Sequence, residues 1–460
     1  MEQDGAFAGL VNGATPGGGG DPSADAARVA SRLVLGVTVW RRQLDALIDA
    51  LYDGGVGKLE PCVRDALRMG LYELLHAGAP PHAAVNEAVS ALRGVRPRAA
   101  GLANALLREA SRQYAKGTLM ELLPAVVDNG GEPSVAMVSA LGVRYSMPDW
   151  VVARWLRRLG RAEAEALLAA CNRVPAYGVR AAGTAALADA ASAAAALAAL
   201  ADDAIAGGAT VAPSLLPGEF LRVGGTMAPL RAALAAGRAA VQDEAAALVV
   251  ALLAPAAGDS LADVCAAPGG KALLAASRGA SVTAVDAHSG RLQLLVAAAA
   301  AQGLSASLAA VHAADARAFC GDGARARSFD AVLVDAPCTG LGVLAKRADL
   351  RWRRAEADLR ERAGLQGALL AAAAALVKPG GRLVYSTCST EPEENEAVVD
   401  AFLAAAAGSF ELEPARGVVR ADGAAAVPPI ALSADGRFLA PLPHRTGTDA
   451  AFGARMRRVR

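Results

Sequence analysis

The stretch of sequence that decides the fold is residues 263–271, which read Asp-Val-Cys-Ala-Ala-Pro-Gly-Gly-Lys. It follows a short apolar run and opens a segment of helical character, so we predict a glycine-rich turn from a strand into a helix. Small residues let a ligand approach the backbone, and the first N–H groups of the helix point at it. The spacing is neither a Walker A loop nor Gly-x-Gly-x-x-Gly. Taken alone, the turn is equally well explained as a tight connection.

Strand and helix patterns alternate from about residue 240 to the end of the chain. We expect strands over 260–265, 281–286, 307–311, 329–335 and 382–387, with helical segments between them. Such alternation is typical of a doubly wound, mostly parallel α/β sheet of Rossmann-like form. A sheet of this kind binds its ligand at the carboxyl ends of the strands.

Two acidic residues stand at successive strand ends. Asp286 closes the second predicted strand, where a carboxylate can accept from both hydroxyls of a ribose. Asp315 follows the third strand, where it can contact an adenine amino group. Either residue alone could cap a helix, and for Asp315 alone capping is the simpler interpretation. Together with the glycine-rich turn, the two acids indicate a nucleoside-like ligand.

Two cysteines follow the fourth and fifth predicted strands. Residues 334–342 read Val-Asp-Ala-Pro-Cys-Thr-Gly-Leu-Gly, and residues 385–389 read Tyr-Ser-Thr-Cys-Ser. Neighbouring strands would bring Cys338 and Cys388 into one pocket. The alternatives are two inert buried thiols, the commonest fate of free cysteine, or a redox pair. Because both thiols lie at the ligand end of the sheet, we favour a chemical role.

The front of the chain has a different character. Residues 28–116 read as helical, with apolar positions such as Leu44, Leu47 and Ile48 at helical spacing. They carry 13 basic and 8 acidic residues, a surplus of five positive charges that could hold RNA phosphates or form an ordinary solvated face. Residues 140–239 predict a small α/β subdomain, with strands near 178–180 and 220–223 around an alanine-rich helix. The alanine run could instead be low-complexity filler.

Composition sets limits on the class of protein. The 460 residues carry a net charge of +1, so a basic surface for nucleic acid must be local. Six cysteines without a Cys-x-x-Cys pair, and five histidines, argue against a zinc site and a disulfide framework. We expect no metal and no membrane span. Residues 1–27 resemble neither a signal nor a transit peptide, and we predict a disordered tail. The cytoplasm is the favoured compartment; a chloroplast or mitochondrion stays open.

Residues 240–460 resemble the RNA cytosine-C5 methyltransferases of the Sun/Fmu type, the NOL/NOP2/Sun family. The resemblance lies in the loop 265–271, Asp-Ala-Pro-Cys at 335–338, Ser-Thr-Cys-Ser at 386–389 and Pro-Glu-Glu-Asn-Glu at 392–396. Residues 28–116 resemble the NusB-type RNA-binding fold, through 67–74, 81–89 and 101–108. A NusB-like front is similar to the branch that acts on small-subunit (16S-type) rRNA.

The resemblance implies a cofactor and a set of site residues. The cofactor would be S-adenosylmethionine, and the partner RNA, with the chain acting as a monomer. Cys388 would be the nucleophile, Cys338 would assist product release, and Asp335 would contact the cytosine and the cofactor. The residues implied to bind the cofactor are Cys265, Ala266, Ala267, Pro268, Gly269, Gly270, Lys271, Asp286, Asp315 and Asp335.

One segment departs from the family pattern. The family often has His-Pro-Asp before a basic tryptophan segment, whereas residues 346–354 read Lys-Arg-Ala-Asp-Leu-Arg-Trp-Arg-Arg. Residues 346–362 hold seven basic and four acidic residues, and we expect them to contact RNA rather than form only a charged helix face.

Three other functions compete with this interpretation. They are the same chemistry on transfer RNA or large-subunit rRNA, a non-catalytic RNA-binding assembly factor, and a DNA cytosine methyltransferase. The intact Asp335, Cys338 and Cys388 argue against the second, and the Thr-Cys motif against the third. The expected domain limits are 1–27, 28–116, 117–239 and 240–460.

Overall fold

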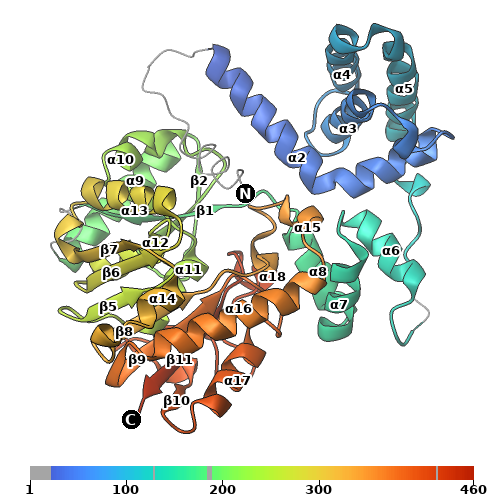
Figure 1. Cartoon of the computed structure of the whole chain (residues 1–460). Helices are drawn as coiled ribbons and strands as arrows, with labels where there is room; N and C mark the ends of the chain where they lie inside the picture. Colours follow the sequence, from blue (N-terminus) through green and yellow to red (C-terminus); the bar gives the residue numbers. More distant parts are fainter. Residues whose placement is uncertain (1–21, 128–129, 184–188, 421–422) are drawn as a thin grey trace. The chain divides into compact units, whose positions relative to one another are not determined.

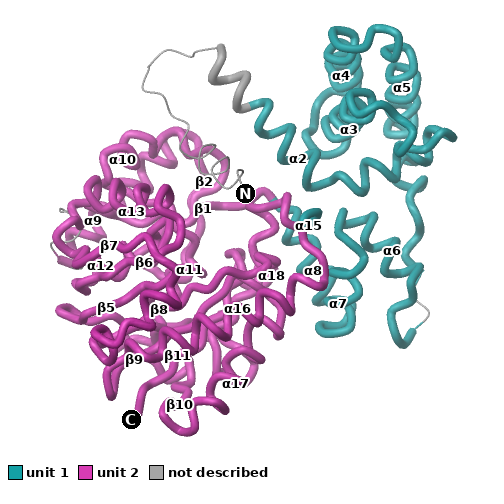
Figure 2. Tube along the Cα trace, viewed as in Figure 1, with its two compact units in different colours: residues 1–173, 351–353 teal, residues 174–350, 354–460 magenta. Residues whose placement is uncertain are grey.

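A computed structural model of the chain describes residues 22–127, 130–183, 189–420 and 423–460. The chain divides into two compact units, coloured separately in Figure 2. Unit 1 holds residues 1–173 and the short segment 351–353, and unit 2 holds residues 174–350 and 354–460. The domain limits expected from the sequence stay predictions, since these units follow compactness alone.

Unit 1 is entirely helical over its described residues (Figure 1). Its main helices are α2 (Pro22–Leu51), α3 (Pro61–Leu75), α4 (Pro81–Val95), α5 (Ala100–Lys116), α6 (Val135–Arg144), α7 (Asp149–Leu159) and α8 (Arg161–Ala170). Helices α3 and α4 each begin at a proline, which lacks the N–H that a first turn leaves unpaired. Gly117, at φ +77°, ends α5 in the left-handed conformation. Helix over residues 28–116 is thereby confirmed.

The predicted tail, residues 1–27, overlaps the first helix of the described chain. Residues 1–21 lie outside the described residues. Residues 22–27 form the start of α2, so the prediction was wrong there. Farther along α2, the apolar positions singled out from their spacing are buried: Leu44 and Leu47 are 0% exposed and Ile48 is 2% exposed. They pack with α3, α4 and α5 into one core.

Unit 2 begins with a small antiparallel sheet of order β2-β3-β1-β4. Its strands are β1 (Tyr177–Ala181), β2 (Thr210–Ala212), β3 (Phe220–Gly224) and β4 (Ala239–Val241), and its helices are α9 (Ala190–Ala206) and α10 (Arg231–Ala235). The predicted strands near 178–180 and 220–223 are confirmed as β1 and β3. The alanine run of α9 packs through Leu200 and Ala204 against this sheet, so the low-complexity alternative was wrong.

The rest of unit 2 is a seven-stranded sheet of order β10-β11-β9-β8-β5-β6-β7 (Figure 1). The strands are β5 (Ser260–Asp263), β6 (Ser281–Asp286), β7 (Leu308–Ala313), β8 (Phe329–Asp335), β9 (Val377–Thr387), β10 (Phe410–Glu413) and β11 (Phe452–Arg458). The helices are α11 (Glu244–Leu253), α12 (Gly270–Ser277), α13 (Ser289–Ala301), α14 (Ala316–Cys320), α16 (Ala357–Ala374), α17 (Glu396–Ala405) and α18 (Pro443–Thr446). Helix α15 (Leu350–Arg353) belongs mostly to unit 1, which holds residues 351–353.

Helices cover both faces of this sheet, as the predicted doubly wound fold requires. Strand residues alternate between two cores: Leu261 packs with α11, α12 and α13, whereas the next residue, Ala262, shares a core with α14, α16 and α17. The five predicted strands pair in parallel, and β10 and β11 add antiparallel strands beyond β9. The parallel arrangement brings the carboxyl ends of β5, β6, β8 and β9 to one edge, where the candidate site residues lie.

Candidate active site

The glycine-rich turn connects β5 to α12, as the sequence predicted. Its Ala267–Pro268 peptide bond is cis, and Gly269 has φ +112°. A Cβ at Gly269 would lie 2.7 Å from Cγ of Leu295 on α13, so a side chain has no room there. The turn therefore presents backbone, with the start of α12, at the carboxyl end of the sheet.

Asp286, the last residue of β6, is tied to this turn. One carboxylate oxygen accepts from the Ala267 N–H at 3.1 Å, and the other accepts from the His288 N–H at 2.9 Å. The side chain is thus fixed beside the turn.

Asp315 occupies the position that the simpler interpretation gave it. Its carboxylate caps α14 by accepting from the Arg317 N–H, and it also pairs with the Arg317 guanidinium at 2.6 Å. The hydrogen bonds from Arg317 lower the pKa of Asp315 to about 2. Capping and contact with a ligand are compatible here, since the carboxylate is half exposed.

Asp335, the last residue of β8, forms the centre of the polar site. Its carboxylate lies 2.6 Å from Nζ of Lys271 and accepts a hydrogen bond from the Ser386 hydroxyl at 2.7 Å. Burial opposes the charge of Lys271, but the Asp335 carboxylate, with smaller contributions from Cys388 and Asp263, raises its pKa. Lys271 is therefore a permanent cation within electrostatic reach of Cys388.

Asp263 adds a second carboxyl group that the sequence had marked only as part of the motif. It is 1% exposed, and burial together with the negative charge of Asp335 raises its pKa to about 7. Burial and the same acids raise the pKa of the Cys265 thiol, so this cysteine keeps its proton. The carboxyl groups of Asp263 and Asp335 thus lie within electrostatic reach of the Lys271 ammonium, and Asp286 lies within reach of Asp263.

The structure brings the two predicted cysteines together. Their strands, β8 and β9, are parallel neighbours, and Sγ of Cys338 lies 3.2 Å from Sγ of Cys388. The contact with Cys388 and burial raise the pKa of Cys338, so Cys338 holds its proton. A protonated thiol in contact with a second thiol can serve that neighbour as an acid.

Several polar residues near the cysteines were missed as functional residues. Ser386, which holds Asp335, lies in the quoted Ser-Thr-Cys-Ser motif, but a serine in a motif carries no role by itself. Glu394 and Asn395 lie in the Pro-Glu-Glu-Asn-Glu segment, which was identified only by resemblance. The available signal was a pair of polar residues just before a helix, and that pattern is typical of ordinary capping.

The basic segment after Cys338 is largely engaged within the protein. Arg351 is 0% exposed and donates to the carbonyl oxygens of Val39, Ser146 and Cys171, all in unit 1. Lys346 is bound between Asp243 and Asp449 in unit 2. The prediction that this segment contacts RNA was therefore wrong for Arg351 and Lys346, because carbonyl or carboxylate oxygens already occupy their donors.

Trp352 is also held inside unit 1. Its indole N–H donates to the carbonyl oxygen of Thr38 at 2.7 Å, and the Arg41 guanidinium stacks over its ring at 4.2 Å. The tryptophan therefore anchors residues 351–353 in unit 1 rather than offering a stacking surface for a base.

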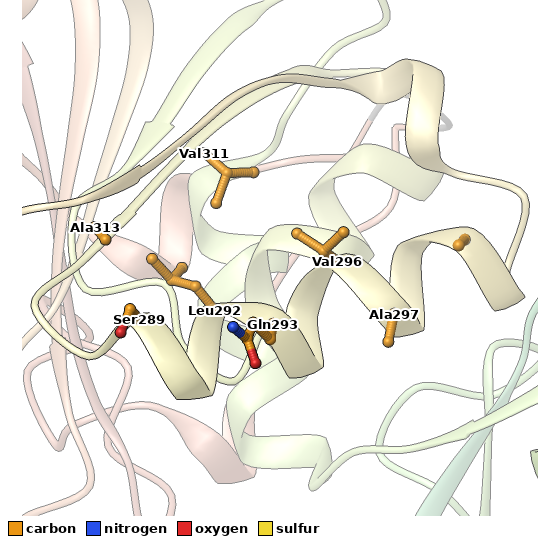
Figure 3. A pocket seen from close by; sticks show the side chains of 8 residues that line it. Ser289, Leu292, Gln293, Val296, Ala297, Val311 and Ala313 are labelled. Atoms are coloured by element: carbon orange, nitrogen blue, oxygen red, sulfur yellow. The ribbon is translucent and has the colours of Figure 1, made fainter.

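No group of three or more His, Cys, Asp or Glu in the described part of the chain could hold a metal ion. Among these same residues, no helix has both the length and the apolar character for a membrane span. Figure 3 shows an apolar groove of about 460 Å³ between α13 and β7, lined by Leu292, Val296 and Val311 among others. None of the predicted site residues lines it.

Comparisons with known proteins agree with this architecture. The family model described as 16S rRNA methyltransferase RsmB/F matches residues 250–457, and the NusB family model matches residues 18–112. A Synechocystis protein named probable ribosomal RNA small subunit methyltransferase B is 33% identical over 399 residues, covering 82% of this chain and 80% of that protein. Putative methyltransferase Rv1407 of Mycobacterium tuberculosis is 34% identical over 455 residues, covering 94% and 89%.

Solved structures give the same result for the fold. The crystal structure of PH0851 superposes with a TM-score of 0.70 at 26% identity, over 93% of this chain and 89% of that one. NSun6 from Pyrococcus horikoshii with SFG has a TM-score of 0.52 at 20% identity, over 68% and 98%, and so supports the fold alone.

Similarity above 30% identity thus extends over more than two thirds of both this chain and its relatives. It includes the helical front as well as the sheet that carries the paired cysteines. The chain belongs to the RsmB/F family of 16S rRNA methyltransferases, with a NusB domain in front of the methyltransferase domain.

Proposed function

We propose that this protein transfers a methyl group from S-adenosylmethionine to carbon 5 of a cytosine in small-subunit rRNA, through a covalent bond between Cys388 and the base. The observation that carries the proposal is the 3.2 Å contact between Sγ of Cys338 and Sγ of Cys388, beside the Lys271–Asp335 ion pair. Two free thiols in contact at the ligand end of a parallel sheet have no evident structural use.

The residues around the turn are suited to S-adenosylmethionine. We assign its binding to residues 265–271, Asp286, Asp315 and Asp335. Bound there, S-adenosylmethionine supplies an electrophilic methyl group on a positively charged sulfur. Asp263, Asp335 and Asp286 all lie within electrostatic reach of Cys265, so the acids at the turn make the site favourable for a cationic ligand. The missing Cβ at Gly269 lets the backbone approach that ligand closely.

Cys388 performs the covalent step. Carbon 5 of cytosine is a poor nucleophile, but a thiolate that adds to carbon 6 converts the ring into an enamine able to accept the methyl group at carbon 5. The positive charge of Lys271 stabilises the attacking thiolate. Solvent water then takes the carbon 5 proton, the electron pair of that C–H bond restores the double bond of the ring, and the bond between carbon 6 and Sγ breaks to release Cys388 as a thiolate.

Asp335 and Cys338 complete the chemistry on the base. Asp335, oriented by Lys271 and Ser386, contacts the base, and the Lys271 ammonium beside it offsets the negative charge that develops on the ring when the thiolate adds. Cys338 retains its proton because of burial and its contact with Cys388, so it can return a proton to the departing sulfur. Its position next to the leaving thiolate matches a role in product release.

The choice of small-subunit rRNA rests on the front of the chain and on the relatives. A NusB domain with a surplus of basic residues offers a surface for RNA phosphates. Relatives that share both parts are named small subunit methyltransferase B. Transfer RNA and large-subunit rRNA are the competing substrates.

A denaturing gel with labelled rRNA tests the covalent step. Cys388→Ala should form no enzyme–RNA adduct and no product, because no thiolate can reach carbon 6. Cys338→Ala should accumulate a methylated adduct, because addition and transfer proceed while release is impaired. The reverse pattern would exchange the roles of the cysteines. Activity retained in both variants without an adduct would refute the mechanism.

A further inference from the structure

We propose that Glu394 and Asn395 are positioning residues that separately hold the two cysteine loops, Glu394 the loop of Cys338 and Asn395 the loop of Cys388. The inference rests on the proposed function for its kinetic consequence, while its structural part rests only on the contacts of unit 2. The side-chain hydrogen bonds described for the two residues go to neighbours of the cysteines, so each holds its loop through those neighbours, and the Glu394 charge also helps to raise the pKa of Cys338.

Glu394 fixes the residue that follows Cys338. Its side chain is 0% exposed, and its carboxylate accepts from the backbone N–H of Thr339 at 2.8 Å and from the Thr339 hydroxyl at 2.5 Å. Thr339 is also 0% exposed, so it has no water to replace these bonds. A buried carboxylate without such donors would be strongly destabilising, which makes this contact obligatory in the fold.

Gln366 on α16 connects the same Glu394 carboxylate to the residue before Cys338. One side-chain N–H donates to the Glu394 carboxylate at 3.0 Å, and the other donates to the Pro337 carbonyl oxygen at 3.0 Å. Residues on both sides of Cys338 are therefore tied, directly or through Gln366, to one buried carboxylate.

Asn395 makes the corresponding contacts around Cys388. Its side-chain oxygen accepts from the Thr387 hydroxyl at 2.6 Å, and its side-chain N–H donates to the Ser389 carbonyl oxygen at 3.0 Å. The Ser389 N–H in turn donates to the Thr387 hydroxyl at 3.2 Å. Cys388 thus sits at the centre of a turn closed by a single amide.

The position of Asn395 gives an independent reason for this assignment. It is the N-cap residue of α17, where an asparagine side chain ordinarily accepts from its own helix, yet no such bond is present. The amide is directed instead to the Cys388 turn. The backbone between Glu394 and Asn395 is itself fixed, since the buried Tyr385 hydroxyl donates to the Glu394 carbonyl oxygen.

Loss of the Glu394 contacts and loss of the Asn395 contacts should therefore have different kinetic effects. Loosening the Cys338 loop leaves the nucleophile in place and impairs release, whereas loosening the Cys388 turn impairs addition. A merely structural role would weaken both steps together. Each lost hydrogen bond of ordinary net strength corresponds to about a two- to tenfold change in an equilibrium.

The kinetic test compares Glu394→Asp with Asn395→Asp in the full-length protein, using labelled rRNA and S-adenosylmethionine. Aspartate at 394 is one methylene too short to keep its donors, so adduct release should slow about tenfold or more while adduct formation stays within about twofold of wild type. Aspartate at 395 cannot donate to Ser389, so adduct formation should slow about tenfold or more. Affinity for S-adenosylmethionine should not change in either variant.

Two further variants serve as controls. Glu394→Gln keeps an oxygen for the Thr339 N–H and Gln366, and its amide can donate to the Thr339 hydroxyl, so release should be rescued. Glu413→Asp makes the same shortening on a carboxylate paired with Arg455 at the far edge of the sheet, and should change neither step. Equal losses of both steps at 394 and 395, or no rescue by Glu394→Gln, would overturn the proposal.

A measurement without RNA keeps the inference separate from the proposed function. Phenylarsine oxide condenses with two adjacent thiols to a cyclic dithioarsenite and water, so its affinity reports the Cys338–Cys388 spacing. Cys388→Ala gives the background from other cysteines. Glu394→Asp should lose about tenfold in affinity relative to wild type and Glu394→Gln should not. Unchanged affinity of Glu394→Asp for phenylarsine oxide would contradict the proposal that Glu394 holds the Cys338 loop. An enzyme–RNA adduct formed by Cys388→Ala would instead contradict the proposed function alone.

Discussion

Replacing Asp263 by asparagine should make the protein more stable at neutral and alkaline pH. Asp263 ends β5 just before the glycine-rich turn and is 1% exposed. Burial and the charge of Asp335 raise its pKa from 3.8 to about 7. The folded state then binds this proton more tightly than the unfolded chain, so ionisation between about pH 4 and pH 7 costs stability as pH rises.

The size of the effect follows from that difference in pKa. At about 1.4 kcal/mol per pH unit, a rise from 3.8 to about 7 corresponds to about 4 kcal/mol once the pH is well above 7. About 3 kcal/mol of this should appear between pH 5 and pH 8. Asparagine cannot ionise, and its side-chain oxygen can still accept from the Cys265 N–H, as Asp263 does at 3.3 Å.

Denaturant unfolding at pH 5 and pH 8 measures this difference. The free energy of unfolding of Asp263→Asn, relative to wild type, should be about 3 kcal/mol more favourable at pH 8 than at pH 5. Asp330→Asn is a control of opposite sign, because the hydrogen bond from Lys378 lowers the pKa of Asp330 to about 2. That variant should lose stability at neutral pH. A relative stability of Asp263→Asn that does not change with pH would refute the buried, protonated Asp263.

Three further predictions follow from the same contacts. Asp286→Ala should weaken S-adenosylmethionine about tenfold or more, since a charged acceptor is lost, and unchanged affinity in calorimetry would refute the assignment. Reversing the exposed Arg93 and Arg98 of unit 1 to glutamate should lower rRNA affinity and the slope of its salt dependence without changing cofactor affinity; equal affinity would remove this surface from substrate binding. Arg351→Ala should destabilise unit 1 by about 3 kcal/mol or more, because several buried carbonyl oxygens lose their donor; a midpoint of unfolding equal to wild type would contradict that.

The parallel part of the sheet was predictable from the sequence because burial on both faces produces predominantly apolar runs. Strands 281–286 and 329–335 match β6 and β8 residue for residue. Strands β10 and β11 were missed because their residues alternate with charge, as in Arg455 and Arg457, which pair with Glu413. Such antiparallel edge strands lack the signal that identifies a buried parallel strand.

The candidate site, too, has a part that could be predicted from the sequence and a part that could not. Residues at strand ends could be predicted, since Asp286, Asp335 and both cysteines are placed by the topology of the sheet. The contacts that orient them could not, because Glu394 and Asn395 reach loops 55 and 6 to 8 residues away through tertiary packing. The prediction that Arg351 contacts RNA failed for a related reason. In the sequence, a basic residue that donates to carbonyl oxygens cannot be distinguished from one that binds phosphate.

Bisulfite sequencing of rRNA tests the central claim most directly. Small-subunit rRNA from cells that lack this protein should have lost 5-methylcytosine at one position, and the wild-type gene should restore it. The same gene carrying Cys388→Ala should not restore it, although the protein still binds S-adenosylmethionine. An unchanged pattern of 5-methylcytosine in small-subunit rRNA, or restoration of the mark by Cys388→Ala, would contradict the proposed function.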